Sequence, residues 1–186
     1  VWTGFMTLDG IVDSPGGVLE GHPQGGWVLS TPFDEAAFSL KGEEIAETSA
    51  LMFGRRSYED FAPEWNGSPD HAAYQDIPKI VVSSSLDEAD LHEGWGETRI
   101  LRSTEEVAQE KAGEGGTIFI HGSAELARRL GEAGLIDRYH LLLFPVTLGT
   151  GKRFLPTSEH DRQDLRLRDS EAYGNGVVKL VYDVVR

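Results

Sequence analysis

Short apolar runs alternate with segments of helical periodicity along most of the chain. The runs that predict strands are residues 1–8, 50–53, 79–83, 99–102, 117–121, 139–145, 165–167 and 177–184. The intervening segments that predict helices are residues 33–49, 57–61, 103–112 and 123–133. Strands and helices that alternate and then end in two neighbouring strands are typical of an α/β fold. We therefore predict a largely parallel mixed sheet with helices on both faces and an antiparallel C-terminal pair.

Residues with capping side chains indicate where the predicted helices begin. Thr31 is the expected N-cap of the helix over residues 33–49. Ser57 is expected to open a short helix that Pro63 limits, and Ser123 is expected to cap the helix that follows it.

The segment 13–26 predicts a long loop, because it is rich in glycine, proline and polar residues. Loops of this length in compact domains are often functional. No linker, repeat or low-complexity segment divides the sequence, so we expect a single domain over residues 1–186.

Composition narrows the classes of function. The 186 residues are 39% hydrophobic and 26% charged, as in ordinary soluble proteins, and their formal net charge is −14. This charge disfavours nucleic acids and anionic membranes as partners, because both require a basic face. An anionic cofactor would need locally clustered arginine. The absence of cysteine excludes disulfides and thiolate ligands, the six histidines form no metal-ligand pattern, and no apolar run approaches a membrane span, so we expect a cytoplasmic protein without a metal.

Three of the predicted strands end in residues suited to bind phosphate. In an open α/β sheet, nucleotides bind beyond the carboxyl ends of the strands, where glycine allows close approach and helix N-termini attract anions. One such segment carries two adjacent arginines, whose planar guanidinium groups match phosphate geometry. The residues expected to contact a nucleotide are Gly54, Arg55, Arg56, Ser57, Val82, Ser83, Ser84, His121, Gly122, Ser123 and Ala124.

Each of these signals, taken alone, also fits a purely structural explanation. Residues 54–57 fit a helix start with two solvated arginines, residues 83–85 a polar strand end, and residues 121–124 a close-packed turn. His121 fits a hydrogen-bonded spacer as well as a proton donor. The three signals together favour one nucleotide lying across the ends of several strands.

Two acids and two aromatic residues are candidates for a substrate site. Asp9 ends the first predicted strand, and Asp34 opens the first predicted helix. A carboxylate in an apolar pocket can hold a cationic or amide-like ring and support its protonation. Asp9 also fits a turn residue, and Asp34 fits an acid favoured by the helix dipole. Trp27 and Phe38 are candidate pocket aromatics, with core packing as the alternative.

The ordered set of motifs resembles the dihydrofolate reductase superfamily. The resemblance is carried by residues 7–10 (TLDG), 53–59 (FGRRSYE), 79–84 (KIVVSS) and 120–126 (IHGSAEL). Residues 134–137 (GLID) and 145–151 (PVTLGTG) narrow it to the branch named for the C-terminal reductase domain of the riboflavin-synthesis enzyme RibD. The similarity covers nearly the whole chain.

This resemblance implies a dihydrofolate reductase-like three-layer fold of about eight strands and an NADPH-dependent reductase. By their match to the family's motifs, residues 55–57 would meet the cofactor phosphates, Ser83 and Ser84 the adenosine end, and residues 122–124 the pyrophosphate and the vicinity of the nicotinamide. Asp9 matches the acid of the riboflavin branch at the substrate end.

Asp34 and Phe38 resemble the acid and the aromatic residue with which folate reductases hold their pterin. His121 stands where those enzymes usually have glycine, and residues 139–144 lack the threonine that they set beside their acid. These two departures disfavour folate itself as the substrate and favour another heterocycle.

The sequence thus predicts hydride transfer from NADPH to a pterin-like or a pyrimidine- or flavin-precursor-like ring held near Asp9, Trp27 and Asp34. The family resemblance adds the expectation of a homodimer. The alternative is a non-catalytic nucleotide- or ligand-binding protein on the same fold. A plain interaction module would leave the three loop signals unexplained.

Overall fold

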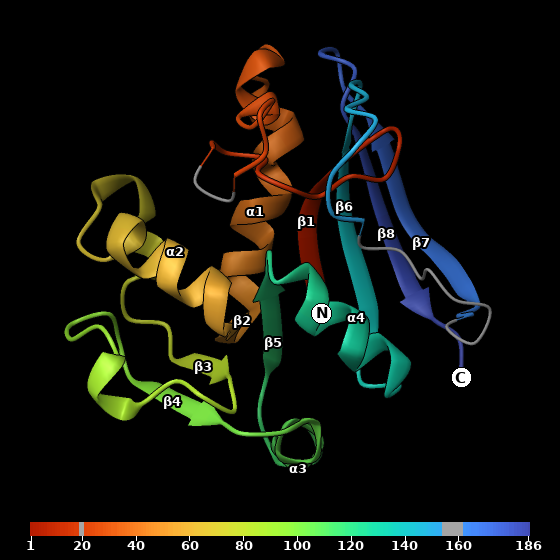
Figure 1. The fold of residues 1–186 in the computed structure, drawn as a ribbon. Helices are drawn as coiled ribbons and strands as arrows, with labels where there is room; N and C mark the ends of the chain where they lie inside the picture. Colours follow the sequence, from red (N-terminus) through yellow and green to blue (C-terminus); the bar gives the residue numbers. More distant parts are fainter. Residues whose placement is uncertain (19–20, 154–161) are drawn as a thin grey trace. The chain divides into compact units, whose positions relative to one another are not determined.

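A computed structural model describes residues 1–18, 21–153 and 162–186 of the chain (Figure 1). The chain separates into two compact units. Unit 1 comprises Val1–Lys41 and Ile136–Arg186, and unit 2 comprises Gly42–Leu135. The expectation of a single domain over residues 1–186 stays a prediction.

Unit 2 is built on four parallel strands in the spatial order β4-β3-β2-β5. The strands are β2 (Thr48–Gly54), β3 (Lys79–Val82), β4 (Thr98–Leu101) and β5 (Thr117–His121). The helices that follow β2, β4 and β5 are α2 (Arg55–Trp65), α3 (Thr104–Ala112) and α4 (Ala124–Glu132), and short 3-10 turns cover Pro69–Tyr74 and Glu88–Asp90. Parallel strands are covered on both faces, which explains why β2, β3 and β5 read as unbroken apolar runs.

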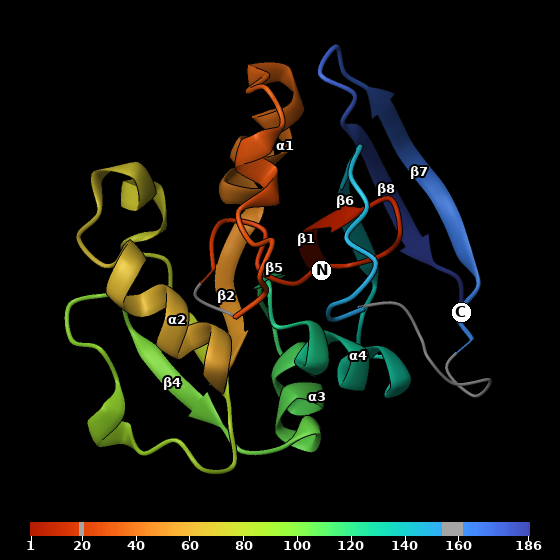
Figure 2. The same ribbon diagram turned by 45° about the horizontal axis from the view of Figure 1, so that its top comes forward.

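Helix α2 packs on β2 and β3 (Figure 2). Aromatic side chains fill the core of unit 2 beside this helix. Phe53 of β2 stacks on Trp95 at 5.7 Å between ring centroids, and Tyr58 of α2 lies 5.8 Å from the same indole. The ammonium group of Lys79 lies 4.7 Å from the Trp95 ring and donates to the backbone oxygens of Tyr74 and Gln75. Burial lowers the pKa of Lys79 to about 8.

Unit 1 contains a four-stranded mixed sheet in the order β1-β6-β8-β7. Strand β1 (Trp2–Thr7) is parallel to β6 (Arg138–Phe144), whereas β8 (Val178–Val184) is antiparallel both to β6 and to β7 (Leu165–Ala172). A 3-10 turn covers Trp27–Ser30, and α1 (Glu35–Glu47) begins in unit 1. The core packed around this sheet consists of Trp27, Val28, Ala37, Leu40, Leu142, Phe144, Tyr173 and Val177.

The predicted fold class is confirmed. Among the described residues, eight strands form a mixed sheet in which β1–β6, β2–β3, β2–β5 and β3–β4 pair in parallel, whereas β6–β8 and β7–β8 pair antiparallel. The antiparallel C-terminal pair is present, but β7 extends to Ala172 and is longer than the predicted 165–167. Its later residues are polar on both faces, so the hydrophobic pattern does not reveal them.

Two of the predicted helices have wrong boundaries. The first helix begins at Glu35, because Asp34 rather than Thr31 caps it: Asp34 Oδ1 accepts hydrogen bonds from the backbone N–H groups of Ala36 and Ala37 at 3.0 and 3.4 Å. Helix α2 begins at Arg55 and continues past Pro63 to Trp65. A proline near the end of a helix forfeits only one hydrogen bond there, so the helix need not stop before it.

Candidate functional site

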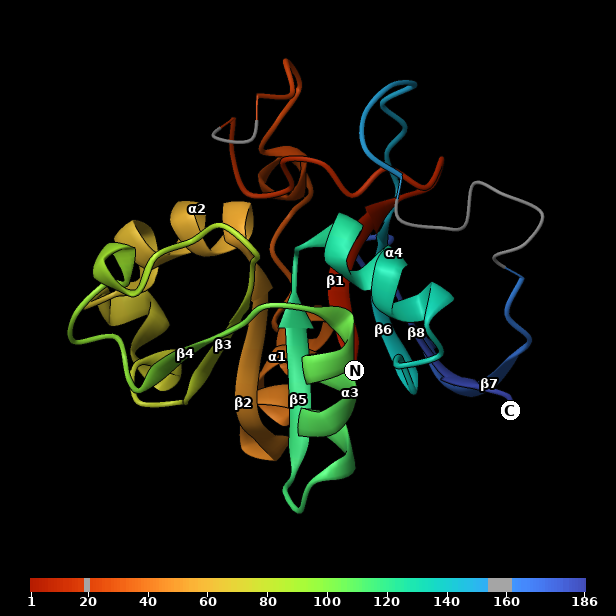
Figure 3. The ribbon, with the colours of Figure 1, turned by 60° about the horizontal axis from the view of Figure 1, so that its bottom comes forward.

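The three predicted loop signals lie at one edge of the unit 2 sheet. They follow β2, β3 and β5, which are parallel and adjacent in the order β3-β2-β5. Gly54, the last residue of β2, pairs in register with Val82, the last residue of β3. In Figure 3 the arrowheads of β2 and β5 point the same way, and α2 and α4 begin beyond them. The turns after the three strands are therefore neighbours at the carboxyl edge.

Two hydrogen bonds to serine hydroxyl groups join the turn after β2 to the turn after β5. The backbone N–H of Gly54 donates to Ser123 Oγ at 2.9 Å. In return, the backbone N–H of Ser123 donates to Ser57 Oγ at 3.1 Å. Ser123 Oγ donates in turn to the backbone oxygen of His121 at 3.2 Å. We call the two bonds that join the turns, from Gly54 N–H to Ser123 Oγ and from Ser123 N–H to Ser57 Oγ, the serine latch.

The turn after β5 has an unusual backbone. Gly122 and Ser123 both have positive φ angles, 57° and 50°. At Gly122 a Cβ atom would lie 3.3 Å from Phe61 Cζ, so the residue must be small as well as left-handed. For a serine the left-handed conformation costs about 1 kcal/mol, and the serine latch holds Ser123 in it.

The prediction that the Ser123 side chain caps α4 is wrong. Ser123 occupies the N-cap position, but its side chain accepts no hydrogen bond from the first turn of the helix. Its left-handed backbone directs the hydroxyl to Gly54 instead. The expectation that Ser57 caps α2 is also wrong, because Gly54 holds that position in extended conformation and Ser57 lies within the first turn.

Arg55 connects the turn after β3 to the turn after β2. Arg55 Nη1 donates to Ser85 Oγ at 3.0 Å, and its Nε pairs with Glu59 at 2.7 Å. Ser83 is buried and its Oγ accepts from the backbone N–H groups of Ser85 and Leu86 at 3.2 and 3.0 Å. Ser84 is exposed. The three turns are thus linked by side-chain hydrogen bonds into one continuous set.

Two residues of this set were not among the sequence candidates. Ser85 is the third of three consecutive serines, and this run of serines was the signal that could have identified it. Arg102, at the end of β4, donates to the backbone oxygens of Ser83 and Leu86 at 3.1 and 2.5 Å. Nothing in the sequence marks Arg102, because its partners are backbone atoms of a turn nineteen and sixteen positions earlier.

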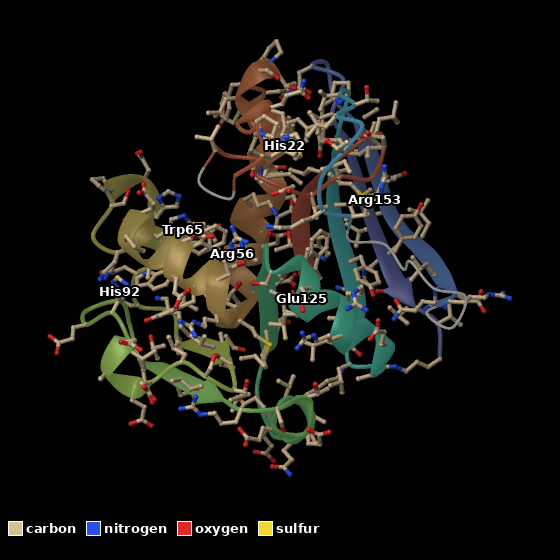
Figure 4. The ribbon with its side chains drawn as sticks, viewed as in Figure 1. His22, Arg56, Trp65, His92, Glu125 and Arg153 are labelled. Carbon is tan, nitrogen blue, oxygen red and sulfur yellow. The ribbon has the colours of Figure 1, made fainter. Side chains whose placement is uncertain are left out.

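The charge at this edge favours an anion. The first turn of α2 contains Arg55 and Arg56 and no acidic residue, although the helix N-terminus already carries positive partial charge. Both arginines are exposed. Figure 4 shows Arg56 on α2 and Glu125 on α4 near the end of β5. In a chain of net charge −14, two arginines at a helix N-terminus give this edge a local positive charge of the kind that attracts phosphate.

His121 contributes its backbone to the turn, whereas its side chain packs in the core. The imidazole is 8% exposed and lies edge-on to Trp65 and Tyr74, 6.0 and 5.6 Å between ring centroids. Ala124 is the first residue of α4, at its positive end.

In unit 1, Asp9 is fixed by a dense set of donors. Its carboxylate accepts the Thr7 hydroxyl at 2.6 Å and the backbone N–H groups of Gly149 and Leu148 at 2.7 and 3.2 Å. The Thr7 hydroxyl, followed by these N–H groups, lowers the pKa of Asp9. Such a carboxylate is ionised at neutral pH and anchors the segment 148–149 to the end of β1. This arrangement favours the turn interpretation; a catalytic role for Asp9 stays a prediction.

Asp34 retains an unused oxygen. Its Oδ1 caps α1, while no group in the described part of the chain donates to Oδ2. Phe38, one helical turn on, lies 5.9 Å from Phe5 and stacks on Phe33 at 5.4 Å. Phe33 is 76% exposed, so one side of this aromatic group faces solvent.

Trp27 packs as a core residue. It is 3% exposed, its indole N–H donates to the backbone oxygen of Asp13 at 2.8 Å, and its ring meets Phe144 edge-on at 5.5 Å. These contacts fit core packing, the alternative interpretation of Trp27, better than a place in a pocket wall.

Within residues 1–18, 21–153 and 162–186, no group of three or more His, Asp or Glu side chains is placed to hold a metal ion. The helices of the same residues include none with the length and apolar character that crossing a bilayer requires.

The eight-stranded mixed sheet with its helices has the dihydrofolate reductase-like fold. The family model for the RibD C-terminal domain matches residues 1–179, and the chain belongs to that family. Among curated proteins, it is 26% identical over 186 residues to the uncharacterized protein YyaP of Bacillus subtilis strain 168, covering 95% of this chain and 90% of YyaP.

Two solved structures share the fold. A candidate riboflavin biosynthesis protein from Shewanella sp. PV-4 superposes with a TM-score of 0.77 at 18% identity, over 100% of this chain and 98% of that one. Dihydrofolate reductase from Enterococcus faecalis, complexed with NADP(H) and RAB-propyl, superposes with a TM-score of 0.62 at 14% identity, over 100% and 95%. They confirm the predicted resemblance at the level of fold.

The serine latch predicts an order of stability for two substitutions at one position. Ser123→Ala removes the acceptor for Gly54 N–H and keeps the left-handed strain, so we expect a loss of about 2 kcal/mol in the free energy of unfolding. Ser123→Gly loses the same acceptor but relieves the strain, so its loss is smaller by about 1 kcal/mol. Urea unfolding of the three proteins measures both differences. A glycine variant less stable than the alanine variant contradicts this account.

Proposed function

We propose that this protein is an NADPH-dependent reductase that transfers a hydride to a small heterocyclic substrate. The observation that carries the proposal is the continuous hydrogen-bonded set of turns after β2, β3 and β5, with two arginines at the start of α2. One extended ligand with phosphates along its length fits such an edge better than three separate ligands do. Membership of the RibD C-terminal domain family supports the reductase assignment.

The turn after β2 is proposed to hold phosphate through its guanidinium groups and a hydroxyl. Ser57 Oγ accepts from Ser123, yet no described residue accepts the Ser57 hydroxyl hydrogen, which leaves one donor for a phosphate oxygen. Arg55 and Arg56 add charge-assisted donors beside it.

The other two turns are proposed to hold the rest of the cofactor. The backbone at Gly122, Ser123 and Ala124, at the positive end of α4, suits the pyrophosphate. Ser84 is exposed and Ser85 is held by Arg55, so their hydroxyls suit the adenosine end. Gly54, Val82, Ser83 and His121 shape the turns through their backbone and buried side chains.

Asp34 and Phe38 of unit 1 are proposed to bind the substrate ring. Bound NADPH supplies the hydride from its nicotinamide ring. Asp34 Oδ2 accepts an N–H of a cationic or amide-like ring and so favours the protonated form that receives a hydride at a C=N or C=O carbon. The aromatic side chain of Phe38, with Phe33 stacked on it, offers a face for the ring. Pterin-like rings and pyrimidine or flavin precursors have this chemistry.

A second candidate is nucleotide or ligand binding without catalysis. The contacts of two expected substrate-side residues favour it: the Asp9 carboxylate is saturated by structural donors, and Trp27 is buried in the core. Turnover distinguishes this candidate from the reductase.

We expect Arg55→Ala to weaken NADPH binding at least roughly tenfold, because it removes a charge-assisted phosphate contact. Tryptophan fluorescence during titration with NADPH measures the affinity. Arg128→Ala is the matched control: it also removes an arginine from an i, i+4 ion pair on an exposed helix face, with Glu132. Unchanged affinity in Arg55→Ala, or an equal loss in Arg128→Ala, contradicts the placement of the phosphates.

Asp34 is tested by two substitutions that separate capping from chemistry. Asparagine caps helices as well as aspartate does, so Asp34→Asn keeps the stability of α1 but loses the charge. We expect its NADPH oxidation with pterin and pyrimidine substrates to fall roughly a hundredfold, while NADPH affinity is unchanged. Asp34→Ala additionally loses about 1 kcal/mol of stability. Full turnover in Asp34→Asn excludes a role for this carboxylate, and wild-type protein that binds NADPH yet reduces none of the rings supports the second candidate.

A further inference from the structure

The turn after β3, residues 83–86, is held by side-chain hydrogen bonds to both kinds of backbone group. The buried Ser83 hydroxyl accepts from the backbone N–H groups of Ser85 and Leu86 at 3.2 and 3.0 Å. The backbone oxygens of Ser83 and Leu86, at the two ends of the turn, accept from Arg102 Nη1 at 3.1 and 2.5 Å. A single guanidinium group from the end of β4 therefore bridges the first and last residues of the turn.

The backbone from which the Arg102 side chain extends is itself fixed. The backbone N–H of Arg102 donates to Glu106 Oε2 at 2.7 Å, and Ser103 Oγ accepts from the backbone N–H of Glu106 at 3.3 Å, at the start of α3. On the side of the turn, the backbone N–H of Ser83 donates to the backbone oxygen of Leu101 at 2.9 Å. Less conformational freedom is lost when a guanidinium group on a fixed backbone forms its hydrogen bonds, so these bonds hold the turn more firmly.

The residues between the two ends of the turn are those proposed to meet the adenosine end of the cofactor. Ser84 and Ser85 are exposed, whereas Leu86 is 1% exposed and anchors the turn in the core. Ser85 Oγ already accepts from Arg55 Nη1 at 3.0 Å, which leaves its hydroxyl hydrogen as the donor for a ligand oxygen. The places of these two hydroxyl groups follow from the backbone that Arg102 holds at both ends.

We propose that Arg102 is a positioning residue for the adenosine end of the cofactor. It acts through the backbone of residues 83–86, whose ends it holds with charge-assisted hydrogen bonds, and so sets where Ser84 and Ser85 offer their hydroxyl groups. This inference rests on the proposed function, because it takes the turn after β3 as the part of the site that meets adenosine.

The alternative role for Arg102 is a direct contact with the 2′-phosphate of NADPH, since the residue is exposed. The two roles differ in what they imply for NADH, which has the same adenosine but no 2′-phosphate. A residue that positions the turn supports the binding of both dinucleotides equally. A residue that contacts the 2′-phosphate supports the binding of NADPH alone.

Arg102→Met tests the positioning role, because it keeps an aliphatic stem and removes the donors. We expect the dissociation constants for NADPH and NADH to rise by the same factor, roughly tenfold. Tryptophan fluorescence during titration with each dinucleotide measures both constants. Arg99→Met is the matched control, since Arg99 lies on the same strand and its guanidinium group pairs with Glu110 instead of with the turn. We expect its affinities to equal those of the wild type.

Amide hydrogen exchange in the free protein distinguishes positioning from a general loss of stability. In Arg102→Met we expect the amides of Ser85 and Leu86, which donate to the Ser83 hydroxyl, to exchange roughly tenfold faster, whereas the amides of β2 exchange as in the wild type. Unchanged exchange at Ser85 and Leu86, or a loss of affinity confined to NADPH, overturns the inference. Wild-type binding that Arg102→Met leaves unchanged overturns this inference alone, whereas a wild type that binds neither dinucleotide overturns it together with the proposed function.

Discussion

The candidate cofactor site depends on the serine latch, in which Ser57 and Ser123 bond the turns that follow β2 and β5. Each hydroxyl accepts a backbone N–H from the other turn's segment, so the two turns stabilise each other. The latch holds Ser123 in a left-handed conformation that a serine would otherwise avoid. With that backbone fixed, α2 and α4 begin beside each other at the carboxyl edge of the unit 2 sheet. The positions of the two helix N-termini follow from these bonds.

The electrostatics of the edge have a consequence for binding. Arg55 and Arg56 add positive charge to a helix end that is already positive, an arrangement that costs stability without an anion nearby. Glu59 offsets part of the charge of Arg55, and Ser85 orients its guanidinium group toward the turn after β3. In a strongly acidic chain this local reversal of charge is a specific property of the site, and it explains how an anionic cofactor can be attracted despite the net charge.

The strands could be predicted from the sequence where both of their faces are buried. Strands β2, β3 and β5 are covered on both faces and read as apolar runs, whereas the exposed second half of β7 reads as a polar loop. That the candidate residues of unit 2 lie together at one edge was predictable, because they stand at the ends of those strands or directly after them. The roles of individual side chains were not. Thr31 and Asp34 both have side chains that can cap a helix, and only the three-dimensional structure shows that Asp34 does so. The sequence around Trp27 is the same whether its side chain lies in the core or lines a pocket, so the pattern could not distinguish the two. Arg102 donates to backbone atoms far away in sequence, which no sequence pattern marks.

The central claim is that one dinucleotide spans the turns after β2, β3 and β5. Titration of ¹⁵N-labelled protein with NADPH, followed through the backbone amide resonances, tests it most directly. The account predicts that amides in residues 54–57, 83–86 and 121–124 shift together and saturate with one dissociation constant. Shifts confined to one of these turns, different dissociation constants for them, or no saturable shift at any of the three would contradict it.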